Sequence, residues 1–218
     1  MVRRTKQDAQ ATRERILDTA ERVFEARGVA GTTLNHIASA AGVTRGAIYW
    51  HFTDKADLFN AMMERITLPF EAVGGVGTGK GSPPSLGQLT DGLVELLRRV
   101  TTDTRAARVF DIVSHKVEYV GETQSLRARH VEGRNACVAD IQRSLAAARR
   151  RGELPRGVPA RAAAIGLHAM IDGLLRNWML EPGGFDLPRV GRQAIGAYLG
   201  GLKGPVAGVR TTRPRART

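Results

Sequence analysis

The sequence predicts an all-α fold of about nine helices, with a small three-helix domain at the N-terminus and a larger helical domain after it. Apolar residues recur at helical spacing along most of the 218 residues. Two short patterns of this kind, within residues 32–42 and 43–52, adjoin at a glycine. No stretch of useful length alternates apolar and polar residues as a strand would. These observations favour helices throughout the chain, without an internal repeat.

The first predicted helix buries one apolar stripe and ends at Gly28. Glycine is frequent at this position because it tolerates the left-handed conformation that stops a helix. The helix should form one wall of a core shared by three helices. Its stripe, at i, i+1, i+4, i+7 and i+8, comprises Ile16, Leu17, Ala20, Val23 and Phe24.

The second predicted helix is short and ends at Gly42, again a residue suited to a helix stop. Threonine is a preferred N-cap residue, and two threonines precede the helix. We expect His36 to be a surface or capping side chain. The apolar positions, at i, i+3, i+4 and i+7, are Leu34, Ile37, Ala38 and Ala41.

The third predicted helix covers about residues 44–51 and has an unusual outer face. Thr44 is an N-cap residue type, and Ile48 lies on the apolar side with Val43, Ala47 and Phe52. Arg45, Tyr49 and Trp50 fall on the opposite side. A water-exposed helix rarely displays Tyr and Trp, whereas a helix that lies on DNA has a use for both. Two short helices joined by a tight glycine turn are typical of a DNA-binding helix-turn-helix, which we place at residues 9–55.

The side chains of the recognition helix suggest roles at DNA. Arg45 is the best candidate to contact a base, because its guanidinium can bond to O6 and N7 of guanine together. Thr44 and Ala47 could contact a phosphate or a thymine methyl group. Gly46 lacks a side chain and would let the helix approach the groove floor. Trp50 could lie on the DNA backbone or pack on the following helix.

After this domain the chain divides into a connector, a break, a larger domain and a tail. Asp54 can cap a connector helix predicted at 56–73. Residues 74–85 are rich in Gly, Pro and Ser and predict a flexible break. The larger domain spans 86–202, and the basic tail 203–218 has no apolar pattern and should be disordered.

Five helices are predicted in the larger domain. Pro159 suits a first-turn position and Asp186 an N-cap position. An arginine run followed by Gly152 is a strong helix stop. The predicted helices cover residues 86–101, 105–119, 126–151, 160–180 and 187–199.

The helix at 160–180 is apolar nearly all round, yet His168, Asp172 and Arg176 recur at i, i+4 and i+8. Buried ionisable groups need partners or a water-filled space. One interpretation is a cavity with apolar walls, in which these groups orient the polar end of a hydrophobic ligand. The other is an Asp–Arg pair on a partly exposed stripe. The residues alone leave both open.

Composition excludes several classes of protein. The net charge of +12 favours a polyanion as partner, although an arginine-rich composition has other causes. A single cysteine, Cys137, excludes an intramolecular disulfide, and its apolar neighbours predict an inert buried thiol. No apolar run suits a membrane span or an export signal, so we expect a cytoplasmic protein. The spacings typical of enzyme motifs and of metal ligands are absent, and we expect neither catalysis nor a cofactor.

The first 65 or so residues resemble the TetR family of bacterial transcriptional repressors. Weaker similarity to the AcrR/TtgR-type repressors of multidrug efflux pumps extends over nearly the whole chain, including residues 115–122, 172–178 and 185–187. The N-terminal residues that carry the family resemblance are Thr12 to Leu17, Ala20, Phe24, Gly28, Thr33, Ile37, Ala38, Ala41 to Val43, Gly46, Tyr49, His51, Phe52, Lys55 and Leu58.

The resemblance implies roles that the residues alone do not establish. It implies phosphate contacts by Thr33, Tyr49, His51 and Lys55, and a homodimer in which the last two helices pair with their symmetry mates. It also implies an effector cavity. Its lining residues would be Phe110, Ser114, Val117, Cys137, Val138, Ile141, His168, Ile171, Asp172, Leu175 and Arg176.

The expected function is that of a ligand-responsive repressor. The dimer would bind a palindromic operator of double-stranded DNA, and a hydrophobic effector such as a drug, dye or antibiotic would shift it, through the connector, to a state that releases the operator. The controlled operon would encode a multidrug efflux pump. Two alternatives stay open: a TetR-type regulator of metabolic or stress genes, and an architectural protein that binds DNA irrespective of sequence.

Overall fold

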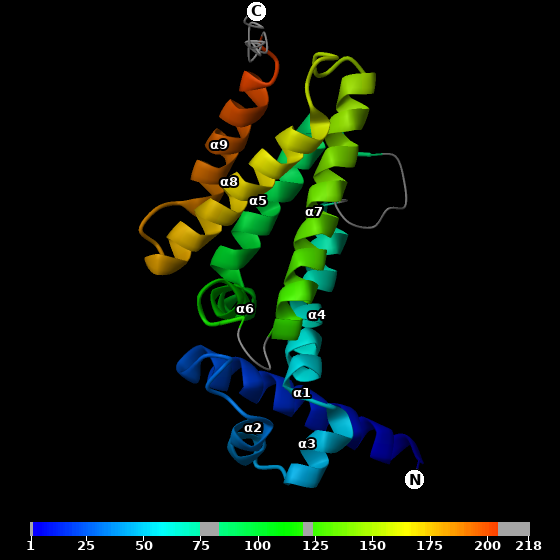
Figure 1. The fold of residues 1–218 in the computed structure, drawn as a ribbon, viewed down its shortest axis with the longest axis vertical. Coiled ribbons are helices and arrows are strands. Elements are labelled where there is room, and N and C mark those ends of the chain that lie inside the picture. The colour runs from blue at the N-terminus through cyan, green and yellow to red at the C-terminus, as the bar shows by residue number, and fades with distance from the viewer. Residues whose placement is uncertain (1, 75–82, 120–123, 205–218) are drawn as a thin grey trace, which may run out of the picture.

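The computed structural model describes residues 2–74, 83–119 and 124–204, although not the side chains of 2–5, 66–74 and 125. These residues form nine helices and no strand, which confirms the predicted all-α fold (Figure 1). In chain order the helices are α1 (Val2–Arg27), α2 (Leu34–Ala41), α3 (Arg45–His51), α4 (Lys55–Gly74), α5 (Leu86–Thr102), α6 (Thr104–His115), α7 (Gln124–Arg150), α8 (Ala160–Leu180) and α9 (Leu187–Gly201).

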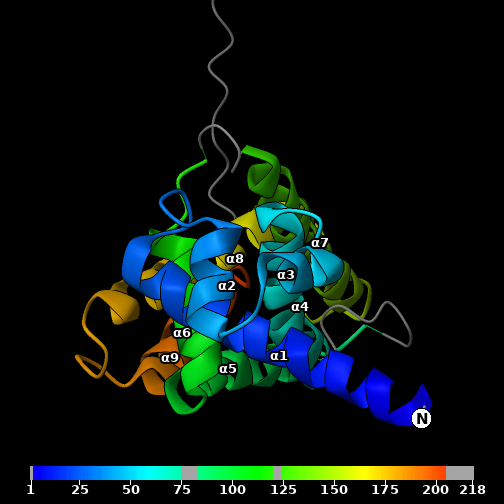
Figure 2. The ribbon, with the colours of Figure 1, turned by 90° about the horizontal axis from the view of Figure 1, so that it is seen from below.

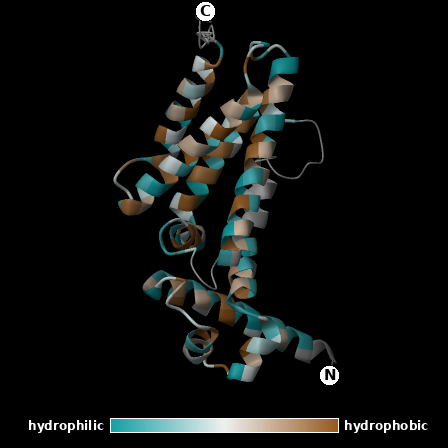
Figure 3. Ribbon diagram, viewed as in Figure 1, coloured by the Kyte–Doolittle hydropathy of each residue, from teal (hydrophilic) through white to brown (hydrophobic). Residues whose placement is uncertain are grey.

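Helices α1, α2 and α3 form a head at one end of the molecule, and α4 rises from it into a body made by the other helices (Figures 1 and 2). Hydrophilic and hydrophobic residues alternate along the body helices, as expected of helices that bury one face (Figure 3). Gly28 and Gly42 have φ values of 72° and 63° and follow α1 and α2. Both predicted glycine stops are therefore confirmed.

Two apolar clusters hold the molecule together. The first joins the buried side chains of α1 to α4, among them Phe24 and Ile48, to Val109 and Ile112 of α6. The second joins the buried faces of α5, α7, α8 and α9. Phe110 packs against both clusters. Helix α6 lies in the predicted larger domain by sequence, but half of its apolar face belongs to the core of the head.

Helix α6 ends at His115, four residues earlier than the periodicity predicts. Lys116 leaves the helical conformation, with φ −113° and ψ 0°. Its carbonyl instead accepts a hydrogen bond at 2.9 Å from the backbone N–H of Val29, in the loop between α1 and α2. A contact between segments so far apart in the sequence cannot be seen in local spacing, which explains the error.

The remaining boundaries lie close to those predicted. Asp186 caps α9, and the carboxylate of Asp54 accepts from the N–H of Asp57 at the start of α4. Pro159 is the N-cap of α8 and not its first helical residue. Of the predicted break, Gly74 ends α4 and Ser85 caps α5, while residues 75–82 lie outside the described part, as do residues 205–218 of the tail.

Candidate DNA interface and effector site

The outer face of α3 exposes the side chains that the sequence predicts for it. Trp50 is 72% and Tyr49 45% exposed, whereas Ile48 is fully buried. The guanidinium of Arg45 lies 5.6 Å from the centre of the Tyr49 ring, at cation–π distance. Gly46 is exposed, and a Cβ added there would meet no atom closer than Oγ1 of Thr44, at 4.0 Å. The face therefore offers a cation, two aromatic rings and, at Gly46, room for a close approach.

Two threonines cap the N-terminal ends of α2 and α3, and the hydroxyl hydrogen of each stays available to donate to another partner. Oγ1 of Thr44 accepts from the N–H of Ala47 at 3.1 Å, and Oγ1 of Thr33 accepts from the N–H of His36 at 3.2 Å. His36 returns the contact, since its Nδ1 accepts from the N–H of Thr33. The expected capping role of His36 is confirmed. Each hydroxyl still has its own hydrogen to donate, so both threonines can bind a phosphate without losing the cap.

His51 closes the C-terminal end of α3 beside a cation from α1. Its ring meets Trp50 edge to face at 4.6 Å between centres. Burial lowers the pKa of His51, and the charge of Arg13 lowers it further. The Arg13 guanidinium lies 5.2 Å from the centre of the Phe52 ring. The sequence does not single out Arg13, because only the contact between α1 and the end of α3 brings it to this surface.

Lys55 has a different role from the predicted one. Its ammonium donates to the backbone carbonyls of Val29, Ala30 and Thr32, at 3.0, 3.3 and 2.9 Å. An ammonium has three N–H donors, and these three carbonyls take them all. The prediction that Lys55 holds a phosphate therefore does not agree with the structure, in which Lys55 ties the loop between α1 and α2 to the start of α4.

A polar cluster lies where α8 meets the end of α6. Nε of Arg176 donates to Oδ2 of Asp172 at 2.8 Å, and Nη1 donates to the carbonyl of Ser114 at 3.0 Å. The side chains of Arg176 and Asp172 are 39% and 44% exposed. The sequence leaves two interpretations of these residues open, a partly exposed Asp–Arg pair and a group that orients a ligand. A half-open ion pair is compatible with both.

Two histidines and a tyrosine extend this polar cluster. The Tyr119 hydroxyl hydrogen-bonds to Nδ1 of His130 on α7. Burial lowers the pKa of His130, with Arg176 lowering and Asp172 raising it. Burial also lowers the pKa of His168, against the charge of Asp172. Neutral imidazoles here can donate or accept a hydrogen bond. Tyr119 and His130 were missed because neither shares a helix with Asp172.

The other predicted effector residues divide into three groups. Ile141, Ile171 and Leu175 are buried within the second apolar cluster, while Phe110 and Val138 are half-buried against it. Val117 follows α6 and packs against the core of the head. Cys137 is exposed on α7, so the prediction of a buried thiol is wrong. Residues 131–137 of α7 are all exposed, so the apolar residues next to Cys137 in the sequence do not cover its thiol.

Comparison with known families decides the identity of this fold. Residues 16–62 match the family model described as bacterial regulatory proteins, tetR family. Residues 84–203 match the model of the C-terminal region of MAATS-type transcriptional repressors. The chain belongs to the TetR family. The head with its exposed α3 is thus the DNA-binding domain of a TetR-type transcriptional repressor.

Individual TetR-family relatives match along most of their length. The transcriptional regulator TtgR of Pseudomonas putida is 40% identical over 187 residues, which cover 86% of this chain and 89% of TtgR. Among solved structures, NalD, the secondary repressor of the MexAB-OprM multidrug efflux pump in Pseudomonas aeruginosa, has a TM-score of 0.79 at 32% identity, covering 90% of this chain and 98% of NalD. SmeT of Stenotrophomonas maltophilia, in complex with triclosan, has a TM-score of 0.78 at 33% identity, covering 95% and 99%.

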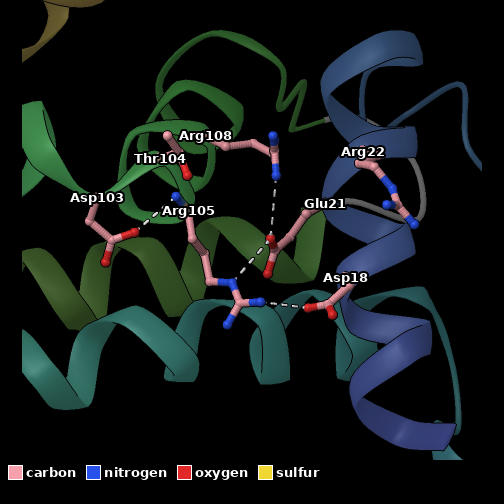
Figure 4. Close-up of a pocket in the computed structure, with 7 residues that line it drawn as sticks. All are labelled: Asp18, Glu21, Arg22, Asp103, Thr104, Arg105 and Arg108. Carbon is pink, nitrogen blue, oxygen red and sulfur yellow. Dashed lines mark hydrogen bonds and ion pairs between the residues drawn. The ribbon is translucent and has the colours of Figure 1, made fainter.

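A polar hollow of about 440 Å³ lies between α1 of the TetR-type head and the start of α6 (Figure 4). It is lined by Asp18, Glu21, Arg22, Asp103, Thr104, Arg105 and Arg108. Its lining is charged, so it differs from the apolar cavity that we predicted for an effector.

Over the described ranges there is no group of three metal-ligating side chains. In the same ranges no helix is long and apolar enough to cross a membrane.

Proposed function

We propose that this protein is a dimeric repressor of a multidrug efflux operon, which leaves its operator when a hydrophobic compound binds to the body. The observation that carries the proposal is the presence, in one molecule, of an exposed aromatic and cationic face on α3 and a half-open ion pair on α8 that is hydrogen-bonded to the end of α6. The first suits DNA and the second suits the polar end of a ligand. The names of the relatives, which include NalD and SmeT, support the efflux operon as target.

At the operator, Arg45 is proposed to contact a guanine and Gly46 to bring the helix close to the groove floor. Tyr49, His51 and Thr33 would hold phosphates, with Thr33 at the N-terminus of α2. Two such heads, spaced about 34–36 Å apart, match successive turns of one face of DNA. A palindromic operator therefore fits a two-fold symmetric dimer.

At the effector site, Arg176 and Asp172 would orient the polar end of the compound, with His168 beside them. Ile171 and Leu175 would contact its apolar part once α6, α7 and α8 move apart. A compound that is apolar with one polar group, such as the triclosan bound by SmeT, suits this arrangement. Differential affinity for the two states of the dimer is what would weaken operator binding.

The dimer is proposed to form through α8 and α9. The outer face of α8 exposes Ile165 between Ala162 and Ala169, and α9 exposes Ala197 with three glycines. Small side chains let helices approach closely, and an apolar face of this kind gains free energy when a second copy covers it. The protein would act in the cytoplasm, as a regulator and not as an enzyme.

The proposal is tested by a gel shift with DNA from upstream of the gene and its neighbours, against random competitor DNA. Hydrophobic drugs and dyes, triclosan included, are then added. Specific retardation that a compound releases is the expected result. Specific binding that no compound releases would support the repressor but contradict the proposed response to a hydrophobic effector. Equal binding to random DNA would favour the architectural alternative.

A further inference from the structure

An acidic stripe on α1 faces three arginines from α4 and α6. Four carboxylates recur at i, i+4, i+7 and i+11, so they share one side of α1. The arginines come from α4 and from the first two turns of α6. The stripe consists of Glu14, Asp18, Glu21 and Glu25, and the arginines are Arg65, Arg105 and Arg108.

Arg65 binds the stripe from α4. Its Nη2 lies 2.8 Å from the carboxylate of Glu14 and 2.6 Å from that of Asp18, and its Nη1 lies 2.8 Å from that of Glu21. This contact fixes α1 to the middle of α4, the helix that follows α3 directly.

Arg105 and Arg108 bind the same stripe from α6 (Figure 4). Arg105 reaches Asp18 at 2.7 Å and Glu21 at 3.6 Å. Arg108 reaches Glu25 at 2.8 Å and Glu21 at 3.9 Å. The Glu21 side chain is only 2% exposed, so it lies between arginines of two different elements with almost no contact with water.

The far end of α6 is tied to the effector site. Arg176 donates to the carbonyl of Ser114 in the last turn of α6, and the carbonyl of Lys116 accepts from Val29 of the head. Helix α6 therefore contacts the polar cluster at one end and the acidic stripe at the other. A compound that binds Arg176 therefore contacts the same guanidinium that holds the Ser114 carbonyl.

We propose that Glu21, with Arg105 and Arg108, is the point at which a displacement of α6 is passed to the head. This inference rests on the proposed function, because it describes the regulation of the same effector site. If α6 moved without α1, Glu21 would keep only Arg65 and Glu25 would lose Arg108. Removing cations from a buried carboxylate is unfavourable. Helix α1 therefore follows α6 when α6 moves, and α3 follows α1 through the core they share.

The first test needs no compound. Coupling is reciprocal, so operator binding at the head must alter α6 if α6 acts on the head. Amide hydrogen exchange of α6 is measured with and without operator DNA for the full-length protein. The variants are Arg105→Gln with Arg108→Gln, the charge-preserving Arg105→Lys with Arg108→Lys, and a control, Arg98→Gln with Arg143→Gln. In the control each arginine is paired with a carboxylate of its own helix, Arg98 on α5 and Arg143 on α7.

Operator DNA should slow exchange in α6 of the wild type, the lysine variant and the control, but not of the glutamine variant. Equal protection in the glutamine variant would overturn the proposal, as would its absence in the wild type. This experiment uses no compound, so it tests the coupling between α6 and the head even if no compound releases the protein from its operator. Failure of the coupling and failure of the proposed effector response can therefore be distinguished.

The second test uses triclosan as the probe. The ratio of operator Kd with and without triclosan, for which a coupling of about 5- to 150-fold is typical, should fall toward one in the glutamine variant and recover in the lysine variant. Triclosan affinity measured by calorimetry should stay within about twofold of wild type, because neither arginine contacts the effector cluster. A ratio equal to that of the wild type would overturn the inference.

Discussion

Arg176 on α8 donates to the backbone carbonyl of Ser114 at 3.0 Å, and this hydrogen bond joins the proposed effector site to the last turn of α6. The same guanidinium binds Asp172 at 2.8 Å. The last carbonyls of a helix have no partner within the helix, so Arg176 satisfies one that would otherwise need water. One side chain thus links the polar cluster to the helix whose Val109 and Ile112 lie in the core of the head.

Replacing Asp172 and Arg176 together by alanine should leave operator binding intact and weaken release by the effector. Hydrogen bonds to charged groups contribute about 1.5–3 kcal/mol, so the concentration of triclosan that releases half of the operator should rise about tenfold or more. Operator affinity and release are both measured by fluorescence anisotropy. Glu95→Ala with Arg98→Ala is the control, since it removes an exposed pair within α5. Loss of DNA binding by a folded dimer would contradict the assignment.

Arg45→Ala should relax the preference of the operator at one base position in each half-site. A bidentate arginine contact contributes about 1–3 kcal/mol of discrimination against the wrong base. The measurement is the affinity for a set of operators that differ at single positions. A uniform loss over all sequences would mean that Arg45 only holds a phosphate.

Gly46→Ala should weaken operator binding while the protein stays as stable as the wild type or becomes more stable. Alanine is better than glycine within a helix by about 1 kcal/mol, and the new Cβ meets nothing in the protein closer than 4.0 Å. A drop in affinity with an unchanged or raised melting temperature would place the clash in the DNA groove. Unchanged affinity would show that α3 does not approach the groove floor at this residue.

Lys55→Met should destabilise the head without changing the salt dependence of DNA binding. The variant loses hydrogen bonds to three carbonyls, and about 2 kcal/mol or more of stability should be lost with them. Each phosphate contact contributes about 0.9 to the slope of log affinity against log salt. A slope reduced by this amount for each protomer would restore the phosphate role that the structure argues against.

Acidification should destabilise the protein through His130 and His168. Both have a pKa below the ordinary 6.5 because of burial. The unfolded chain therefore takes up its protons first as the pH falls, and the free energy of unfolding decreases from pH 6.5 downward until the folded pKa values are passed. His130→Gln with His168→Gln should reduce this decrease, measured by urea unfolding. An identical decrease in the double variant would disprove the assignment.

The head could be predicted from the sequence because its determinants are local. The N-caps at Thr33 and Thr44, the glycine stops at Gly28 and Gly42, and the outward Trp50 all follow from spacing within one or two turns. Each depends on neighbours along the chain, which a sequence displays directly.

The contacts between head and body could not be predicted in the same way. The spacing of Glu21 in an amphipathic helix predicts a side chain exposed to solvent, yet this side chain is buried against arginines of α4 and α6. Lys55 reads as a cation close to the recognition helix, and three carbonyls of a distant loop take up its donors. Cys137 has apolar neighbours in sequence and is exposed. Each outcome depends on which helices meet, which local spacing does not encode.

The most direct test of the account measures one coupling from both sides. Operator Kd is determined with and without saturating triclosan, and triclosan Kd is determined for the free protein and for the operator complex. The account predicts that both constants rise by the same factor, because the linkage of two ligands is reciprocal. Triclosan that binds the free protein and the operator complex equally, with an unchanged operator Kd, would contradict it.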